Sequence, residues 1–124
     1  MIGNNYFIDT NILIYLLDGD ETLADLLNQK HFVISFITEL ELLSYQNLTN
    51  ENKQVIRELI DECTVIDINL GIKQQVIKLR AKYKLKLPDA IIVASAIHSN
   101  LPLITADKAL IKIENINIIL YELS

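Results

Sequence analysis

Short apolar segments alternate with longer segments of helical periodicity along the whole chain. Five short apolar runs, each bounded by polar residues, are typical of strands buried inside a sheet. These predicted strands span residues 6–8, 32–35, 64–68, 101–105 and 116–121. Because helical segments separate them, the pattern predicts an α/β fold with a central five-stranded, mainly parallel sheet and helices on both faces.

The segments between the strands carry apolar residues three or four positions apart, as amphipathic helices do. Asp20 and Thr49 are candidate N-caps, and Pro88 suits the first turn of a helix. The predicted helices span residues 11–17, 21–28, 38–45, 49–62, 71–84 and 87–99, with a short helix after Asp107. In such folds the functional cleft lies beyond the carboxyl ends of the strands, where the strand order reverses.

The composition is that of one globular domain, which we expect to span residues 1–124. Hydrophobic residues make up 51% of the chain and charged residues 22%, which excludes a disordered chain. No apolar run approaches the roughly 18 residues needed to span a bilayer, and the N-terminus lacks the basic start of a signal peptide. The single cysteine, Cys63, cannot form an internal disulfide. We therefore expect a cytoplasmic protein with no membrane partner.

The charge distribution is more informative than the net charge of -5. An acidic chain is unlike proteins that coat nucleic acid through general positive charge. However, six of the 11 basic residues fall within residues 73–86, which contain no acid. On a helix Lys78 and Lys82 share one face and the other cations lie roughly opposite, so these residues form no single stripe. A solvated helix flank is one interpretation, and contact with RNA phosphates is the other.

Four acidic residues occupy positions from which their carboxylates can meet. Asp9 directly follows the first predicted strand, Asp107 follows the fourth, Asp89 lies in the first turn of a helix, and Glu41 lies on the helix after the second strand. Singly, Asp9 and Asp107 also suit helix caps, and Asp89 suits the helix dipole. Together they favour a site for Mg²⁺ or Mn²⁺, because clustered carboxylates ionise readily only beside a cation and these ions prefer oxygen ligands.

Glu39 competes with Glu41 for a place in this cluster. Two residues apart on a helix means about 200° of rotation, so both side chains cannot face one cleft. Leu40, Leu42 and Leu43 make the apolar face wide. Helical periodicity therefore leaves the choice between the two glutamates open.

Four blocks of the sequence resemble, in the same order, those of PIN-domain ribonucleases, especially VapC-type toxins. The blocks are YFIDTNILI at residues 6–14, ISFITELELL at 34–43, LPDAIIVA at 87–94 and LITAD at 103–107. In the second block of this family the acid directly precedes a Leu-Leu pair, which identifies Glu41 and not Glu39. Many relatives carry a further acid after the fourth block, where this chain has Lys108.

The resemblance implies a single PIN-like domain that acts as a Mg²⁺- or Mn²⁺-dependent endoribonuclease, a hydrolase of RNA phosphodiester bonds. It further implies the toxin of a type II toxin–antitoxin module, with RNA as substrate, a cognate antitoxin as protein partner, and a homodimer. The implied catalytic residues are Asp9, Glu41, Asp89 and Asp107, the implied metal ligands Asp9, Asp89 and Asp107, and the implied polar support Thr10, Asn11 and Thr105.

Two other functions share the same fold pattern, and fold alone does not separate them. An aspartyl-phosphate phosphatase of the haloacid-dehalogenase type has a second aspartate two positions after the first, where this chain has Asn11. The other alternative is a non-catalytic PIN-like or receiver-like interaction module. A receiver has two adjacent acids near the end of the first strand, whereas here Ile8 precedes Asp9. The residue pattern therefore favours the ribonuclease.

Overall fold

The computed structural model describes residues 4–123 and contains one five-stranded sheet with the order β3-β2-β1-β4-β5. Residues 1–3 and 124, the ends of the predicted domain, lie outside the described residues. All four neighbouring strand pairs are parallel, which confirms the predicted sheet. The strands are β1 (Asn5–Ile8), β2 (His31–Ser35), β3 (Thr64–Ile66), β4 (Leu103–Thr105) and β5 (Ile118–Leu120).

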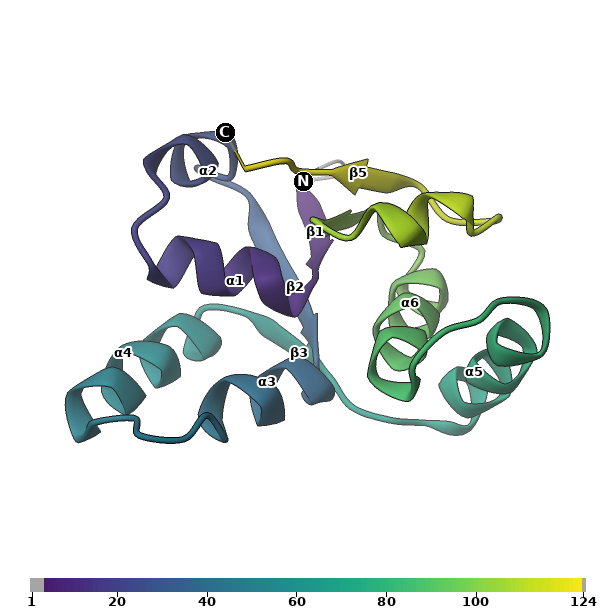
Figure 1. Ribbon diagram of the computed structural model, residues 1–124, viewed down its shortest axis with the longest axis horizontal. Coiled ribbons are helices and arrows are strands. Elements are labelled where there is room, and N and C mark those ends of the chain that lie inside the picture. Colours follow the sequence, from purple (N-terminus) through teal and green to yellow (C-terminus); the bar gives the residue numbers. More distant parts are fainter. Residues whose placement is uncertain (1–3, 124) are drawn as a thin grey trace.

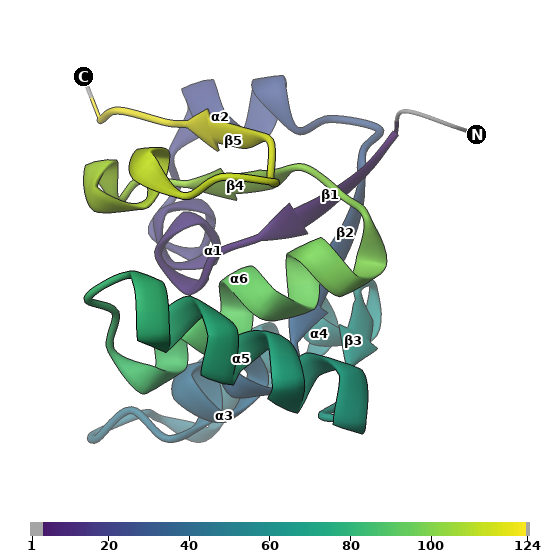
Figure 2. The ribbon, with the colours of Figure 1, turned by 90° about the vertical axis from the view of Figure 1, so that its right-hand side faces the viewer.

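Helices cover both faces of this sheet, with α1 to α4 on one side and α5 and α6 on the other (Figure 1). Figure 2 shows α5 and α6 lying together in front of the strands. Among the described residues, no helix is long and apolar enough to cross a membrane. The helices are α1 (Thr10–Leu17), α2 (Glu21–Leu26), α3 (Phe36–Leu43), α4 (Asn50–Asp61), α5 (Leu70–Lys82), α6 (Leu87–Ser99) and the 3₁₀ helix η1 (Lys108–Lys112).

The central strands are apolar on both faces because helices cover both. Phe7 packs with the apolar residues of α5 and α6, whereas the next residue, Ile8, packs with those of α1, α2 and α4. Successive strand residues point to opposite faces, so a strand buried on both sides carries a continuous apolar run. The same division occurs in β2 and β4, where Val33 and Leu103 share the face of Phe7 while Ile34 and Ile104 share that of Ile8.

The strand order reverses between β1 and β4. The chain passes from β1 outward to β2 and β3, then returns to place β4 and β5 on the other side of β1. Ile8 is in register with Ile104, and the amide of Asp9 donates a hydrogen bond to the carbonyl of Ile104 at 3.0 Å. Asp9 and Thr105 therefore leave the sheet side by side, at the kind of position where open α/β sheets bind ligands.

Most helix boundaries differ from the sequence predictions by one or two residues, and two of these differences have a clear local cause. α3 begins at Phe36, two residues earlier than predicted, because the Ser35 hydroxyl caps it by accepting the Ile37 amide at 3.1 Å. α5 ends at Lys82 rather than at residue 84, because the backbone at Tyr83 is extended, with φ -121° and ψ 150°. Lys84 and Lys86 consequently lie in the connection to α6 and not on a helix face.

Candidate functional site

Asp9 is a buried carboxyl group at the end of the central strand, with only 7% of its surface exposed. Its Oδ1 accepts the amide of Thr10 at 2.8 Å, which caps α1. Its Oδ2 accepts the hydroxyl of Thr105 at 2.6 Å. The capping function weighed for Asp9 is therefore confirmed, and the same residue also joins β1 to the end of β4.

The surroundings of Asp9 disfavour its ionised form. Burial raises the pKa of Asp9 above the ordinary range, against the hydrogen bonds from Thr105 and Thr10, which lower it. The negative charges of Glu41 and Asp107 raise this pKa further. Asp9 thus lies within electrostatic reach of two other predicted site residues.

Asp89 reaches the same edge of the sheet from α6. Because α6 leads into the start of β4, its own first turn lies near the carboxyl ends of the strands. Burial raises the pKa of Asp89, the charges of Asp9 and Asp107 raise it further, and the nearby Lys86 ammonium lowers it. Among the described residues no group donates a hydrogen bond to the Asp89 carboxylate, which leaves both oxygens available to a ligand.

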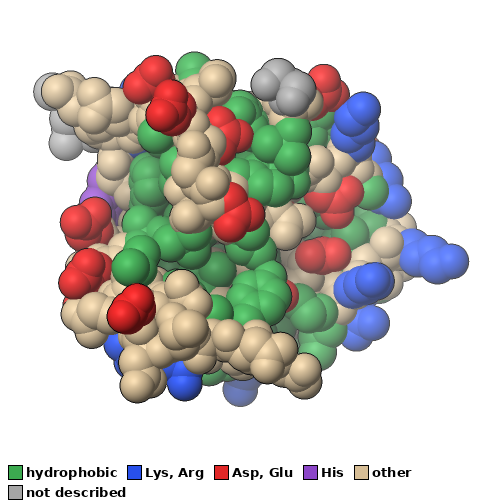
Figure 3. Space-filling model, turned by 60° about the vertical axis from the view of Figure 1, so that its left-hand side comes forward, with side chains coloured by type: hydrophobic (Ala, Val, Ile, Leu, Met, Phe, Trp, Pro, Cys, Tyr) green, Lys and Arg blue, Asp and Glu red, His purple; other side chains and the backbone are tan. Residues whose placement is uncertain are grey.

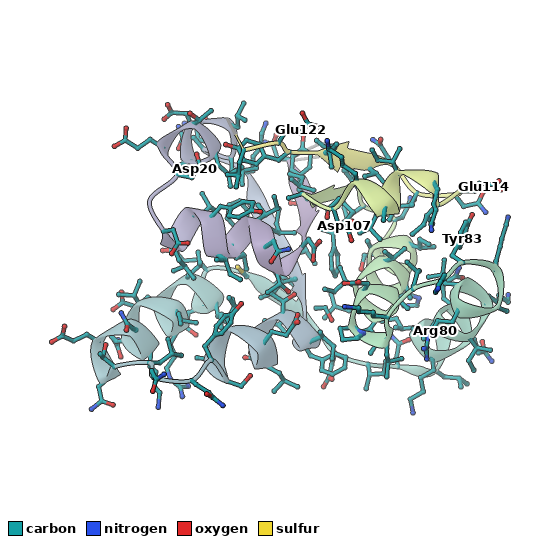
Figure 4. All side chains as sticks on the ribbon, viewed as in Figure 1. Asp20, Arg80, Tyr83, Asp107, Glu114 and Glu122 are labelled. Atoms are coloured by element: carbon teal, nitrogen blue, oxygen red, sulfur yellow. The ribbon has the colours of Figure 1, made fainter. Side chains whose placement is uncertain are left out.

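Asp107 is linked to Asp9 through one hydroxyl group. The amide of Asp107 donates to Thr105 Oγ1 at 3.0 Å, while that hydroxyl donates to Asp9. Oδ1 of Asp107 accepts the amide of Ala109 at 2.9 Å and so caps η1. Figure 4 shows Asp107 near the middle of the molecule, between the ribbons of α1 and α6. Thr105 therefore holds two acidic residues in one arrangement.

Glu41 approaches Asp9 from α3. The hydroxyl of Thr10 donates to Glu41 Oε1 at 2.8 Å, and the charge of Glu41 contributes to the raised pKa of Asp9. Glu39 is partly buried, and within the described residues its carboxylate accepts no hydrogen bond. The structure thus places Glu41, rather than Glu39, beside Asp9.

The predicted polar support is present in part. Thr10 and Thr105 both bond to site carboxylates, whereas Asn11 is exposed and its side chain makes no hydrogen bond within residues 4–123. Thr38, which the sequence patterns did not indicate, lies 2.9 Å from Thr10 through its Oγ1 atom. Its spacing of three residues from Glu41 is the signal that could have revealed it, since residues three apart share a helix face.

The carboxylate oxygens of these acidic residues are chemically suited to bind a divalent cation. Carboxylate oxygens are the preferred ligands of Mg²⁺ and Mn²⁺, and two of these carboxyl groups have pKa values raised partly by neighbouring negative charge. Over residues 4–123, however, no three acidic, histidine or cysteine side chains lie close enough to hold one ion together. The arrangement suits a cation bound directly by one or two carboxylates with water as its other ligands, as Mg²⁺ commonly is.

The basic residues within 73–86 lie in different surroundings in the structure. Lys82 pairs with Glu114 at 3.1 Å, and the Tyr83 hydroxyl accepts the Glu114 amide at 3.0 Å. In Figure 4 Arg80, Tyr83 and Glu114 lie at the α5 side of the molecule, away from Asp107. Lys86 is different, because its charge reaches Asp89. Lys82 therefore lies on a solvated flank of the molecule, whereas Lys86 lies near the site carboxylates.

Comparison with protein families and solved structures gives a consistent result. The model of the PIN domain family matches residues 6–116. A chain of a toxin-antitoxin complex from Klebsiella pneumoniae is 33% identical, with a TM-score of 0.82 over 95% of this chain and 99% of that one. VapBC-1 from nontypeable Haemophilus influenzae is 27% identical, with a TM-score of 0.76 over 94% and 97%.

A more distant relative shares the fold. A chain of VapBC2 from Rickettsia felis, solved bound to a DNA fragment from its promoter, is 20% identical with a TM-score of 0.85. The match covers 95% of this chain and 99% of that chain. No curated protein sequence matches the chain significantly.

Replacing Asp9 by asparagine tests whether its charge destabilises the folded protein. Because the folded pKa is raised, the folded state holds more protons than the unfolded chain between the two pKa values, so stability falls as pH rises through that interval. With chelator present, Asp9→Asn should therefore raise Tm at neutral pH. The difference should shrink as pH falls toward about 4, the ordinary aspartate pKa.

Asp25→Asn is the matched control, because Asp25 is exposed on α2. It should change Tm little and by a similar amount at every pH. A Tm difference for Asp9→Asn that did not vary with pH would contradict the electrostatic explanation. A lower Tm of Asp9→Asn at neutral pH would also contradict it. That result would mean that the hydrogen bonds of the Asp9 carboxylate stabilise the fold more than its charge destabilises it.

Proposed function

The chain belongs to the PIN domain family, and from this premise we propose that it is a metal-dependent ribonuclease that hydrolyses RNA phosphodiester bonds. The observation that carries the proposal is that Glu41, Asp89 and Asp107 all lie within electrostatic reach of Asp9, at the point where the strand order reverses. Hydrogen bonds through Thr10 and Thr105 hold this arrangement. The similarity to a chain of a toxin-antitoxin complex supports a role as a toxin. We propose that the protein is the toxin of a type II module and acts in the cytoplasm.

The proposed catalytic residues are these four acids, and each would act differently. Asp9, Asp89 and Asp107 would hold Mg²⁺ or Mn²⁺, one or two of them directly and the rest through water. Asp89 is the carboxylate least committed to other hydrogen bonds. When bound, the cation lowers the pKa of water and neutralises charge that develops on the phosphate. Thr10 and Thr105 would support the site by fixing carboxylate oxygens, and Asn11 would line it from its exposed position on α1.

Glu41 is the proposed general base. Its Oε1 accepts the Thr10 hydroxyl, and Oε2 accepts no hydrogen bond from the described residues. A carboxylate held by one oxygen keeps the other for a proton from the attacking water. Asp9 is less suited to direct attack on a phosphate, because it is buried and both of its oxygens accept hydrogen bonds. This arrangement supports hydrolysis by water over an aspartyl-phosphate intermediate.

We also propose a cognate antitoxin as protein partner, bound on the α1–α4 side of the sheet. An apolar groove of about 430 Å³ lies between α1, α3 and α4, and its lining includes Leu17, Tyr45 and Val55. Tyr45 and Val55 are 50% and 53% exposed. Asp18 also lines the groove, and Figure 3 shows apolar side chains on this side with acidic ones around them. Such a surface suits an apolar segment with basic flanks. The homodimer implied by the resemblance stays a prediction.

Glu41→Gln tests the proposed base. The change keeps the side-chain shape and the acceptor oxygen for Thr10 but removes the charge. Purified protein with Mg²⁺ or Mn²⁺ should cleave a panel of structured RNAs, and chelator should stop the cleavage. In Glu41→Gln, kcat should fall by about 100-fold or more, as for loss of a general base.

Glu39→Gln provides the matched control, since it makes the same chemical change on the same helix but outside the hydrogen-bond network of the site. It should leave kcat within about twofold. If kcat falls equally in the two variants, Glu41 is not the general base. Absence of metal-dependent cleavage across the panel would favour a non-catalytic interaction module.

Val55→Asp tests the proposed partner surface. An aspartate in the apolar groove would have to lose water on binding, so affinity for the protein encoded beside this gene should fall at least about tenfold, or roughly 1.4 kcal/mol. Ile77→Asp is the control, because Ile77 is 69% exposed on α5, on the other side of the sheet. Calorimetry showing equal affinity for both variants would place the partner elsewhere.

A further inference from the structure

Thr38 carries a fully buried hydroxyl group with one hydrogen-bond partner among the described residues. Its exposed fraction is 0%, and its Oγ1 lies 2.9 Å from Oγ1 of Thr10. Thr10 is itself buried, with 7% exposure. The two hydroxyl groups belong to different helices, α3 and α1, so this bond fixes the two helices relative to each other next to Asp9.

The direction of this bond follows from counting protons. A threonine hydroxyl has one proton to donate, and Thr10 donates its own to Glu41 Oε1 at 2.8 Å. The oxygen of Thr10 must therefore accept, and Thr38 must donate. The result is a directed chain from Thr38 to Thr10 to Glu41, in which each bond polarises the next.

Ser95 shows what a buried hydroxyl on a helix does in the same protein when no such chain exists. Its exposed fraction is also 0%, and its hydroxyl donates to the carbonyl of Ile91, four residues earlier on α6. Serine and threonine within helices commonly make this local bond. Thr38 instead donates to a residue 28 positions away. Its hydroxyl is thus directed at the site and not at its own helix.

We propose that Thr38 is a positioning residue, whose hydroxyl orients Thr10 so that Thr10 holds the Glu41 carboxylate beside Asp9. The expected effect of Thr38 on turnover rests on the proposed ribonuclease function. Glu41 is an exposed side chain with many rotamers available, and fixing it costs conformational entropy. The buried pair of hydroxyl groups supplies the interaction that selects one rotamer.

Thr38→Val removes the hydroxyl and keeps the side-chain shape. Because residues that orient active groups typically contribute about 10- to 100-fold to activity, kcat for RNA cleavage should fall at least about tenfold with little change in KM. Thr38→Ser restores the hydroxyl and should restore kcat. In a Glu41→Gln background, Thr38→Val should cause no further loss, since the group that it positions is already inactive.

Ser95→Ala is the control for loss of a buried hydroxyl, and it should keep kcat within about twofold of the wild type. NMR gives a measurement independent of activity. The Hα–Hβ scalar couplings of Glu41 should show one rotamer in the wild type and in Thr38→Ser, and averaged rotamers in Thr38→Val. If Thr38→Val does not fold, the wild-type couplings decide, because averaged values there overturn the proposal.

The outcomes separate this proposal from the proposed function. Unchanged Glu41 couplings in folded Thr38→Val overturn the positioning by Thr38, whether or not the protein cleaves RNA. An equal loss of kcat from Thr38→Val with and without Glu41→Gln overturns it as well. If no RNA is cleaved but the Glu41 couplings respond to Thr38→Val, the ribonuclease function fails and the positioning stands.

Discussion

The hydrogen bond from the Thr105 hydroxyl to Oδ2 of Asp9 is the interaction on which the site depends. It joins the ends of β1 and β4, the two strands between which the strand order reverses. Apolar residues buried on both faces of the sheet fix these strand ends, so the carboxyl group of Asp9 cannot move out into water. Its raised pKa is the electrostatic consequence of that fixed position.

Two sets of hydrogen bonds, each made through a threonine hydroxyl, connect Asp9 to other residues of the site. On one side Thr105 also accepts the amide of Asp107. On the other side Thr10, the first residue of α1, connects through its hydroxyl to Glu41 and Thr38 on α3. Asp89 approaches from α6 and has no such partner among the described residues. The site therefore combines three acidic residues held by hydrogen bonds or caps with one carboxylate whose oxygens remain available.

Much of the fold could be predicted from the sequence because its causes are local. Continuous apolar runs indicated strands buried on both faces, and the acid after the first run indicated a residue at the carboxyl edge of the sheet. The choice of Glu41 over Glu39 could not come from periodicity, because the apolar face of that helix is wide. Thr38 was missed because the direction of its hydroxyl depends on Thr10, on another helix. The end of α5 was misplaced because residues 82–86 contain no glycine or proline to mark it.

The binding of a divalent cation at Asp9 and Asp89 underlies the whole functional interpretation. The most direct measurement is a crystal structure of the protein soaked in Mn²⁺, with anomalous diffraction recorded to locate the ion. We expect an anomalous peak that places a Mn²⁺ ion in direct contact with a carboxylate oxygen of Asp9 or Asp89. Asp107 should contact the same ion directly or through water. Crystals of protein that cleaves RNA with Mn²⁺, but that show the ion only at other acidic surfaces, would contradict this interpretation.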